Sequence, residues 1–180
     1  MPAGHRSWYT DKPDGEKFFT YITEELPALM QSIFPISNKR KDTFIAGLSM
    51  GGYGAFKAAL NKPEQYAAAA SLSGALDVVD FYTWNCFVPL LDSIFVNKAT
   101  LLKPPHNLLK VAATMGKNPK QCPRLFQACG TEDMLYKENL RFRDVALKYK
   151  LPLTYTDGPG EHNWAYWDAR IQDVLAWFFE

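Results

Sequence analysis

The sequence is short of cysteine, holding only three, at positions 86, 122 and 129, which is too few for a framework of disulfides. It contains no Cys-x-x-Cys pair, and its three histidines are scattered, so nothing predicts a metal site. An excess of one charge is also missing, because the net charge is +1, and we therefore expect no nucleic-acid or anionic-membrane partner. No apolar run reaches the roughly 18 residues of a membrane span, and the N-terminus has no apolar segment typical of a signal peptide. These features predict a cytoplasmic protein with reduced thiols.

The length of 180 residues, with 47% hydrophobic and 22% charged residues, predicts a single globular domain that covers residues 1–180. Helical spacing over residues 16–34 is followed by four short apolar runs, at residues 43–48, 66–74, 124–130 and 151–158, which we interpret as strands. Helical patterns over residues 50–60, 137–150 and 163–179 follow three of them, so strands and helices alternate. This alternation predicts an α/β fold with a mostly parallel sheet flanked by helices.

An aromatic-rich insert occupies about residues 75–121. Such a segment after a strand forms either a wall of a substrate site or a satellite of the core, and the sequence leaves both interpretations open. From the first we take Phe81 and Trp84 as candidate pocket residues, together with Tyr53 and Trp164. Asn107 is a candidate cap for a short helix that ends near Gly116.

A Gly-x-Ser-x-Gly motif, Gly47-Leu48-Ser49-Met50-Gly51, joins the first predicted strand to an Ala-rich helix. In this context the motif is typical of a nucleophile elbow, a turn tight enough to need glycine on both sides of the serine. Ser49 should then adopt a strained backbone conformation, with no room for side chains at either glycine, and the Met50 N–H should face a developing oxyanion. The alternative is a Gly-rich turn needed only for packing.

A serine hydroxyl is a weak nucleophile, so it needs a base, and the base needs an orienting carboxylate. In folds built on this elbow the acid and then the histidine follow the serine along the chain. His162 fits the base because it follows the last strand on a Gly-rich loop, whereas we expect His106 at the surface. Asp133 follows the third strand and is the preferred acid, with Glu132 and Asp157 as alternatives.

Four blocks of the chain, "GLSMGGYGAFKAAL", "SLSGALD", "CGTEDMLY" and "GPGEHNWAYWD", resemble the esterase D family of α/β-hydrolases. The resemblance extends to its tributyrin esterase branch, close to acetyl esterases, feruloyl esterases and S-formylglutathione hydrolases. It implies a triad of Ser49, Asp133 and His162 that hydrolyses short acyl esters through an acyl-enzyme, with no cofactor. An acyltransferase that uses the same acyl-enzyme is an alternative.

The chain departs from this family before the elbow. Family members have several further N-terminal strands and a His-Gly-rich loop that supplies a second oxyanion donor, whereas only 42 residues precede Thr43 here. We therefore expect the strand at residues 43–48 to have an unpaired edge, which a partner chain or self-association covers. If the edge stays exposed, we expect a poorly soluble, weakly active chain or a non-catalytic remnant.

Overall fold

The four predicted strands form one parallel sheet in the computed structural model of the protein, which describes residues 4–180. The strands β1 (Phe44–Leu48), β2 (Ala68–Leu72), β3 (Arg124–Gly130) and β4 (Leu153–Gly158) lie in the order β1-β2-β3-β4. All three pairings are parallel, so the four carboxyl ends meet at one edge of the sheet. The parallel sheet predicted from the sequence is confirmed.

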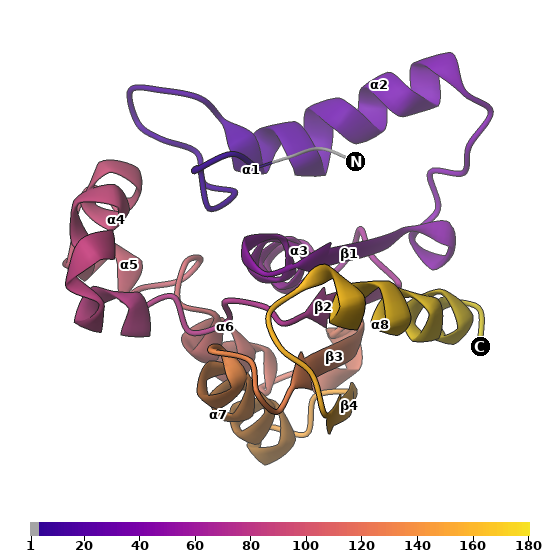
Figure 1. The fold of residues 1–180 in the computed structure, drawn as a ribbon. Coiled ribbons are helices and arrows are strands. Elements are labelled where there is room, and N and C mark those ends of the chain that lie inside the picture. Colours follow the sequence, from indigo (N-terminus) through magenta and orange to yellow (C-terminus); the bar gives the residue numbers. More distant parts are fainter. Residues whose placement is uncertain (1–3) are drawn as a thin grey trace.

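Helices connect and flank these strands (Figure 1). They are α1 (Phe18–Thr20), the π-helical turn η1 (Tyr21–Glu25), α2 (Leu26–Ile33), α3 (Met50–Asn61), α4 (Val88–Phe95), α5 (Lys98–Leu101), α6 (Leu108–Met115), α7 (Tyr136–Lys148) and α8 (Trp164–Phe178), with short 3₁₀ turns at Arg40–Asp42, Asp80–Thr83, Asn85–Phe87 and Pro119–Gln121. The predicted Asn107 cap is confirmed, because its side-chain oxygen accepts from the Lys110 N–H at the start of α6.

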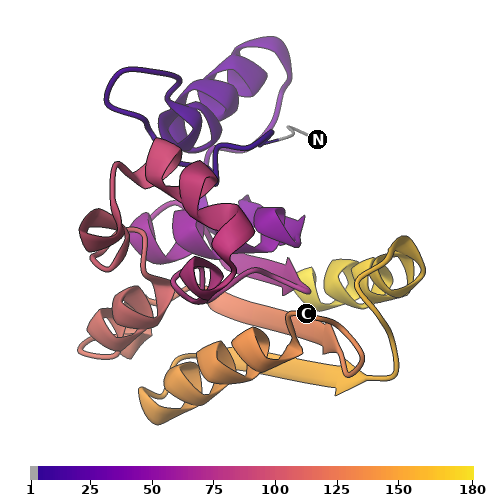
Figure 2. The same cartoon turned by 60° about the vertical axis from the view of Figure 1, so that its left-hand side comes forward.

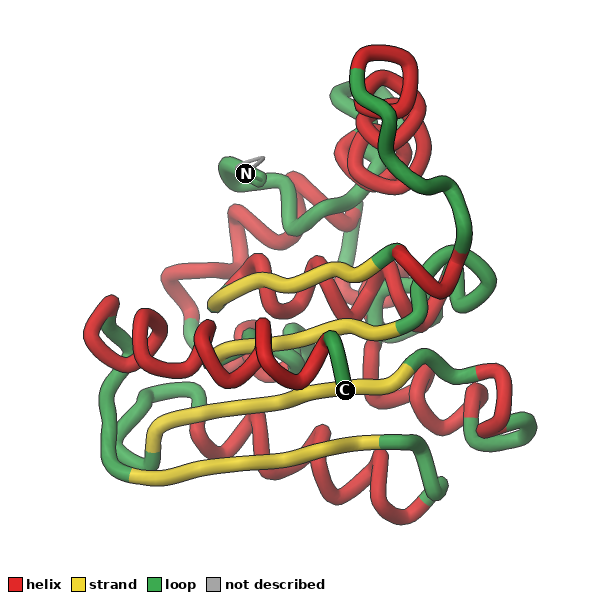
Figure 3. The backbone as a smooth tube through the Cα atoms, turned by 90° about the vertical axis from the view of Figure 1, so that its right-hand side faces the viewer, coloured by secondary structure: helices red, strands yellow, loops and turns green. Residues whose placement is uncertain are grey.

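Helices cover both faces of the sheet, with α8 on one face and α3 and α7 on the other (Figure 3). Strand β2 shows why, since its side chains alternate between the two faces and its first three residues are alanine. Ala68 and Ala70 pack in the cluster that contains the α8 aromatics, whereas Ala69 packs in the larger cluster with α3. Small side chains let the helices approach the middle of the sheet closely.

The helix predicted over residues 16–34 is interrupted, and η1 separates its two α-helical pieces. Pro27 lies at the start of α2 and has no N–H to donate, so the preceding turn cannot close in the usual way and widens into a π-helix. On the apolar face of this helix, Leu29 and Ile33 are 51% and 58% exposed. Only Ile22 of that face is buried.

Strand β1 is the edge strand of the described sheet, because it pairs with β2 and with no other strand in residues 4–180. The N-terminal helices lie beyond this edge (Figure 1). A cavity of about 730 Å³ separates the two, lined on one side by Ile22, Leu26 and Pro27 and on the other by residues 43–48. The unpaired edge expected from the sequence is therefore present in the structure.

The insert at residues 75–121 packs beside the N-terminal segment (Figure 2) and contributes many side chains to the core. Leu91, Phe95 and Leu101 are fully buried, and Phe81 packs edge-on against Trp8 from the N-terminal segment. This placement favours the satellite-core interpretation of the insert over the substrate-wall interpretation.

Candidate active site

The sharp turn predicted at Ser49 is present between the end of β1 and the start of α3. Ser49 has φ 52° and ψ −122°, a region that residues with a side chain rarely adopt, so the predicted strain is confirmed. The Ser49 N–H donates to the Leu72 carbonyl at 2.9 Å, and the Ser49 carbonyl accepts from the Ala75 N–H at 3.1 Å. The end of β2 and the segment after it thus hold both sides of the turn.

The two glycines of the motif have different environments. A Cβ atom on Gly47 would overlap the carbonyl group of Gly51, so the lack of room predicted there is confirmed. The same prediction for Gly51 is wrong, because its nearest neighbour would be the Tyr9 hydroxyl at 3.6 Å, an ordinary contact. Gly51 lies in the first turn of α3 and lines the cavity beside β1, where the helix surface is open.

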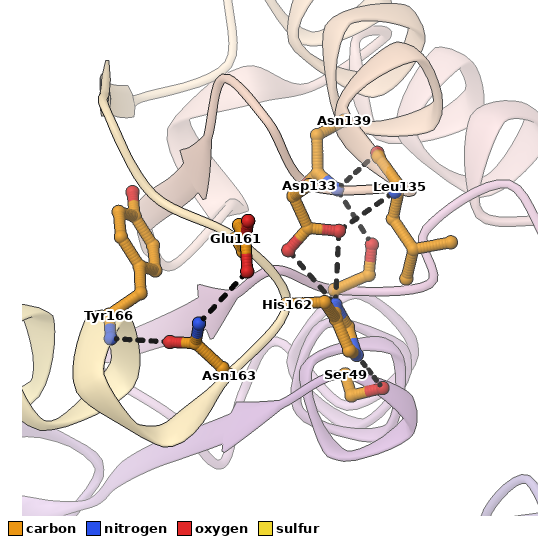
Figure 4. Close-up of polar contacts among 9 residues, drawn as sticks. Ser49, Asp133, Leu135, Asn139, Glu161, His162, Asn163 and Tyr166 are labelled. Carbon is orange, nitrogen blue, oxygen red and sulfur yellow. Dashed lines mark hydrogen bonds and ion pairs between the residues drawn. The ribbon is translucent and has the colours of Figure 1, made fainter.

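The structure brings Ser49, His162 and Asp133 together at the carboxyl edge of the sheet (Figure 4). Ser49 Oγ lies 2.9 Å from His162 Nε2, and His162 Nδ1 lies 2.9 and 3.0 Å from the two carboxylate oxygens of Asp133. The three come from loops after β1, β3 and β4 and meet because parallel strands present these loops side by side. The three candidate residues are therefore within hydrogen-bonding distance of one another in the predicted order, and this geometry suits transfer of a proton from the hydroxyl to the imidazole.

Asp133 is held as a buried carboxylate, with a side chain that is 0% exposed. Burial alone would raise its pKa, but hydrogen bonds from His162 and from the Leu135 N–H outweigh it and keep the pKa below the usual value. Asn139 in α7 fixes the surroundings, since its side-chain amide donates to the carbonyls of Leu135 and Gly74 (Figure 4). The acid is thus ionised and firmly oriented toward the imidazole.

The alternative acids and the other histidine that follows Ser49 in the chain do not join this set of contacts. Glu132 accepts from the Gly160 N–H at 2.5 Å, which lowers its pKa, and so ties the β3 loop to the histidine loop. Asp157 accepts from the hydroxyls of Tyr136 and Tyr155 on the outside of β4. His106 was expected at the surface, but it packs against Phe95, and burial lowers its pKa to about 4.

Of the predicted pocket residues, only Trp164 lines the cavity that contains Ser49, and it is 69% exposed. Tyr53 is fully buried in α3 and donates its hydroxyl to the His106 carbonyl, so its predicted place in the pocket is wrong. Phe81 and Trp84 pack against each other in the insert and do not line this cavity, which corrects those two predictions as well.

The start of α3 supplies the predicted electrostatic feature. Helix α3 begins at Met50, so the Met50 N–H is among the N-terminal amides that have no acceptor within the helix. These amides and the helix dipole favour negative charge beside Ser49 Oγ. Together with the imidazole, the arrangement suits acyl transfer through a tetrahedral intermediate.

Sequence reasoning missed several residues that support the site. Trp167 in α8 packs edge-on against the His162 ring, with ring centroids 4.9 Å apart. Tyr9 lines the cavity with Ser49, although it lies 40 residues earlier in the chain. Asn163, a residue type that favours helix N-caps, accepts from the Tyr166 N–H and thereby fixes the helix that carries Trp167. Only this cap has a signal in the sequence; the other contacts depend on tertiary packing.

Residues 4–180 contain no group of three or more His, Cys, Asp or Glu side chains that is arranged to hold a metal ion. No helix in the same range has the length and apolar character required to cross a membrane.

Comparison with known proteins places the chain among esterases. Residues 1–178 match the model of the family described as Putative esterase. The acetyl esterase of Caldicellulosiruptor saccharolyticus is 26% identical over 185 residues, an alignment that covers 98% of this chain and 70% of that protein. S-formylglutathione hydrolase of Mus musculus is 39% identical over 57 residues, which cover 32% of this chain and 20% of that protein.

Solved structures agree with this placement. The fluorophosphonate-binding serine hydrolase F of Staphylococcus aureus, FphF, is 34% identical and has a TM-score of 0.86. S-formylglutathione hydrolase (FrmB) from the same organism is 32% identical and has a TM-score of 0.83. Each alignment covers 97% of this chain and 68% of the solved chain. About a third of each solved chain therefore has no counterpart in the present sequence.

Proposed function

This chain belongs to the family described as Putative esterase and is a serine hydrolase that acts on ester bonds, and we propose that it cleaves short-chain carboxylic esters with Ser49, His162 and Asp133 as its catalytic triad. The observation that carries the proposal is the continuous set of contacts from Asp133 through His162 to Ser49. Ordinary packing gives no reason for a strained serine, an imidazole and a buried carboxylate to line up in this order.

In the proposed reaction, His162 Nε2 accepts the Ser49 proton as Oγ attacks the ester carbonyl. The Met50 N–H donates to the oxyanion of the tetrahedral intermediate, and Asp133 stabilises the imidazolium. The intermediate expels the alcohol, which takes its proton from His162, and leaves an acyl group on Ser49. Water then attacks the acyl-enzyme with the same histidine as base, the bond from the acyl carbon to Oγ breaks, and the carboxylic acid leaves as His162 returns the proton to Ser49. The steps need no cofactor.

The test is hydrolysis of p-nitrophenyl acetate in a rapid-mixing experiment. We expect a burst of p-nitrophenol equal to the amount of enzyme, followed by a slower steady rate. The Ser49→Ala variant should show no burst, and its turnover should fall by about 10⁶-fold, as when a triad serine is removed. An unchanged burst in Ser49→Ala would rule out this serine as the nucleophile.

We propose acetyl to butyryl groups as the acyl part. Support comes from Trp164 and Tyr9, which place two large aromatic side chains in the cavity that holds Ser49. Rates should fall gradually from p-nitrophenyl acetate and butyrate to octanoate, because an apolar pocket discriminates by only ~1–3 kcal/mol per methylene. Tributyrin should be hydrolysed faster than long-chain triglycerides. Equal or faster hydrolysis of the long chains would contradict the assignment.

Transfer of the acyl group to an alcohol is the alternative reaction. It receives some support from a more distant relative, the diacylglycerol acyltransferase/mycolyltransferase Ag85A of Mycobacterium leprae, which is 24% identical over 97% of this chain. Product analysis with p-nitrophenyl acetate, with and without an acceptor alcohol such as glycerol, separates the two reactions. We expect acetate as the main product in both cases, whereas a dominant acetylated alcohol would favour the transferase.

We further propose that a strand from outside residues 1–180 pairs with the free edge of β1. Support comes from the unpaired strand, the adjacent 730 Å³ cavity and the exposed apolar residues of α2 beside it. Such a strand would also bring backbone amides near Ser49, where a second oxyanion donor is needed. Without it we expect low solubility and turnover reduced by about 10²–10³-fold, the usual effect of one missing donor.

Light scattering and hydrogen exchange test this edge proposal. If the edge is free in the isolated chain, the outward-facing amides of β1 should exchange quickly at low protein concentration. Slow exchange with concentration-dependent mass would instead identify a second copy as the cover. A dilute monomer with protected β1 amides and full activity would contradict the proposal.

The cytoplasm is the proposed location. Support comes from Cys86, Cys122 and Cys129, which are all free thiols in the structure, two of them buried. Fractionation of the producing cells tests it, and recovery of the protein outside the cytoplasm would contradict it.

A further inference from the structure

Lys57 is a fully buried lysine in α3, two turns after Ser49, with an exposed fraction of 1%. Its Nζ donates to Thr10 Oγ1 at 2.7 Å and, over a longer 3.4 Å, to the Trp8 carbonyl. The ammonium group also lies 5.5–5.9 Å from the ring centroids of three aromatic residues: Tyr53, Phe19 and Phe95. All the polar partners of this side chain therefore belong to a single stretch of the N-terminal segment.

That stretch has an unusual backbone. Trp8 and Tyr9 have φ values of 48° and 46°, in the left-handed region that large side chains rarely adopt. Thr10 Oγ1 donates to the Trp8 carbonyl at 3.0 Å while it accepts from Lys57, so the threonine hydroxyl is engaged on both sides. Consecutive strained residues persist only where their surroundings hold them, and the Lys57–Thr10 contact is a buried hydrogen bond that does so.

Tyr9 connects this strained segment to the active site. A Cβ atom on Gly54 would overlap the Tyr9 ring, and the Tyr9 hydroxyl lies 3.6 Å from the position of a Cβ on Gly51. The ring therefore lies along the first two turns of α3, next to the elbow. It lines the same cavity as Ser49 and Met50.

We propose that Lys57 is a positioning residue, which holds the segment with the strained residues Trp8 and Tyr9 on α3 and thereby fixes Tyr9 as the wall of the substrate site beside Ser49. The inference rests on the proposed esterase function for its effect on catalysis, but not for its effect on the segment. Lys57 does not touch the reacting atoms and acts through Thr10 and Tyr9.

The energetics of the buried amine support this role. Burial lowers the pKa of Lys57 to about 7, although Asp11 partly opposes the change. Removing a buried amine that has lost its hydration usually leaves the overall fold as stable or more stable, provided that an apolar side chain of similar volume replaces it. If Lys57 served only the stability of the fold, an apolar replacement would therefore be tolerated without loss. If Lys57 positions Tyr9, the replacement keeps the stability but disturbs the site.

The test compares Lys57→Met with the matched pair Thr10→Val and Thr10→Ser. Lys57→Met keeps the volume of the side chain, Thr10→Val removes the hydroxyl that accepts from Lys57, and Thr10→Ser retains it. In Lys57→Met we expect an unchanged or higher melting temperature, faster hydrogen exchange at the Tyr9 and Thr10 amides, and about 10–100-fold lower kcat/KM for p-nitrophenyl acetate. Thr10→Val should show the same exchange and kinetic changes, and Thr10→Ser should resemble the wild type.

Each result decides the proposal. Wild-type exchange and kinetics in Lys57→Met or in Thr10→Val would overturn it, and so would a Thr10→Ser variant that behaves like Thr10→Val. If the wild type itself proves to lack esterase activity, the proposed function fails, and the exchange measurements alone then decide whether Lys57 holds the segment.

Discussion

Glu132 and Asp133 are neighbours in the sequence, yet their carboxylates bind different parts of the same loop. Asp133 contacts the His162 ring nitrogen at 2.9 Å, whereas Glu132 accepts from the Gly160 N–H two residues earlier. The Asp133 side chain is buried and the Glu132 side chain is exposed. One carboxylate can therefore orient the imidazole, and the other ties down the loop that carries it.

The first prediction separates these two acids. Asp133→Asn should lower kcat by about 10⁴-fold, because an amide at this position favours the wrong tautomer of the histidine. Glu132→Gln should retain most of the activity, since its amide oxygen can still accept from Gly160. Steady-state kinetics with p-nitrophenyl acetate measure both. Equal losses, or a larger loss in Glu132→Gln, would contradict the assignment of the acid.

The second prediction concerns the glycines of the elbow. Gly47→Ala should destabilise the protein by about 2–4 kcal/mol, because its Cβ has no space beside the Gly51 carbonyl. Gly51→Ala should be neutral or stabilise by up to about 1 kcal/mol, because alanine is the better helix former and its Cβ is accommodated. Urea unfolding measures both variants, and the tight elbow at Gly47 is refuted if the two show the same stability.

The third prediction uses the pKa of Lys57, which is 10.5 in the unfolded chain and about 7 in the folded protein. Between these values the unfolded chain binds more protons, so stability rises with pH, by about 5 kcal/mol in total for this group. Lys57→Met should lack this rise. Asp11 and His106 are the other charged or titratable groups coupled to the amine, and the variant retains both.

Urea unfolding of the wild type and Lys57→Met at pH 7 and pH 9.5 measures the difference between the two proteins. The stability advantage of the variant should shrink as the pH rises, because other titrations affect both proteins in a similar way. A constant difference over this range would mean that the buried amine keeps its ordinary pKa.

The sequence predicted the elements and the chemistry of the site better than it predicted the walls of the site. The elbow was recognisable because the turn constrains its own residues, so Gly47 and Ser49 have a local signal. The acid and base were found by chain order, because a parallel sheet brings the ends of successive strands to one edge.

The walls depend on packing between distant segments. Tyr53 and Phe81 are large aromatic residues of the kind that line pockets, but each points into the core. Nothing in the sequence tells which side of an element faces the cavity. Tyr9 and Lys57 were missed for the same reason, since Lys57 contacts Trp8 and Thr10, the neighbours of Tyr9, which lie 49 and 47 residues earlier in the chain. The π-helical turn before Pro27 was missed as well, because the apolar spacing there fits an ordinary helix.

The acyl-enzyme on Ser49 is the central claim, and mass spectrometry of the protein quenched with acid during turnover of p-nitrophenyl acetate tests it most directly. We predict that the intact chain gains the mass of one acetyl group, that the peptide containing Ser49 carries it, and that Ser49→Ala gains none. An acetyl group on another residue, or rapid turnover with no modified chain in either protein, would contradict the account.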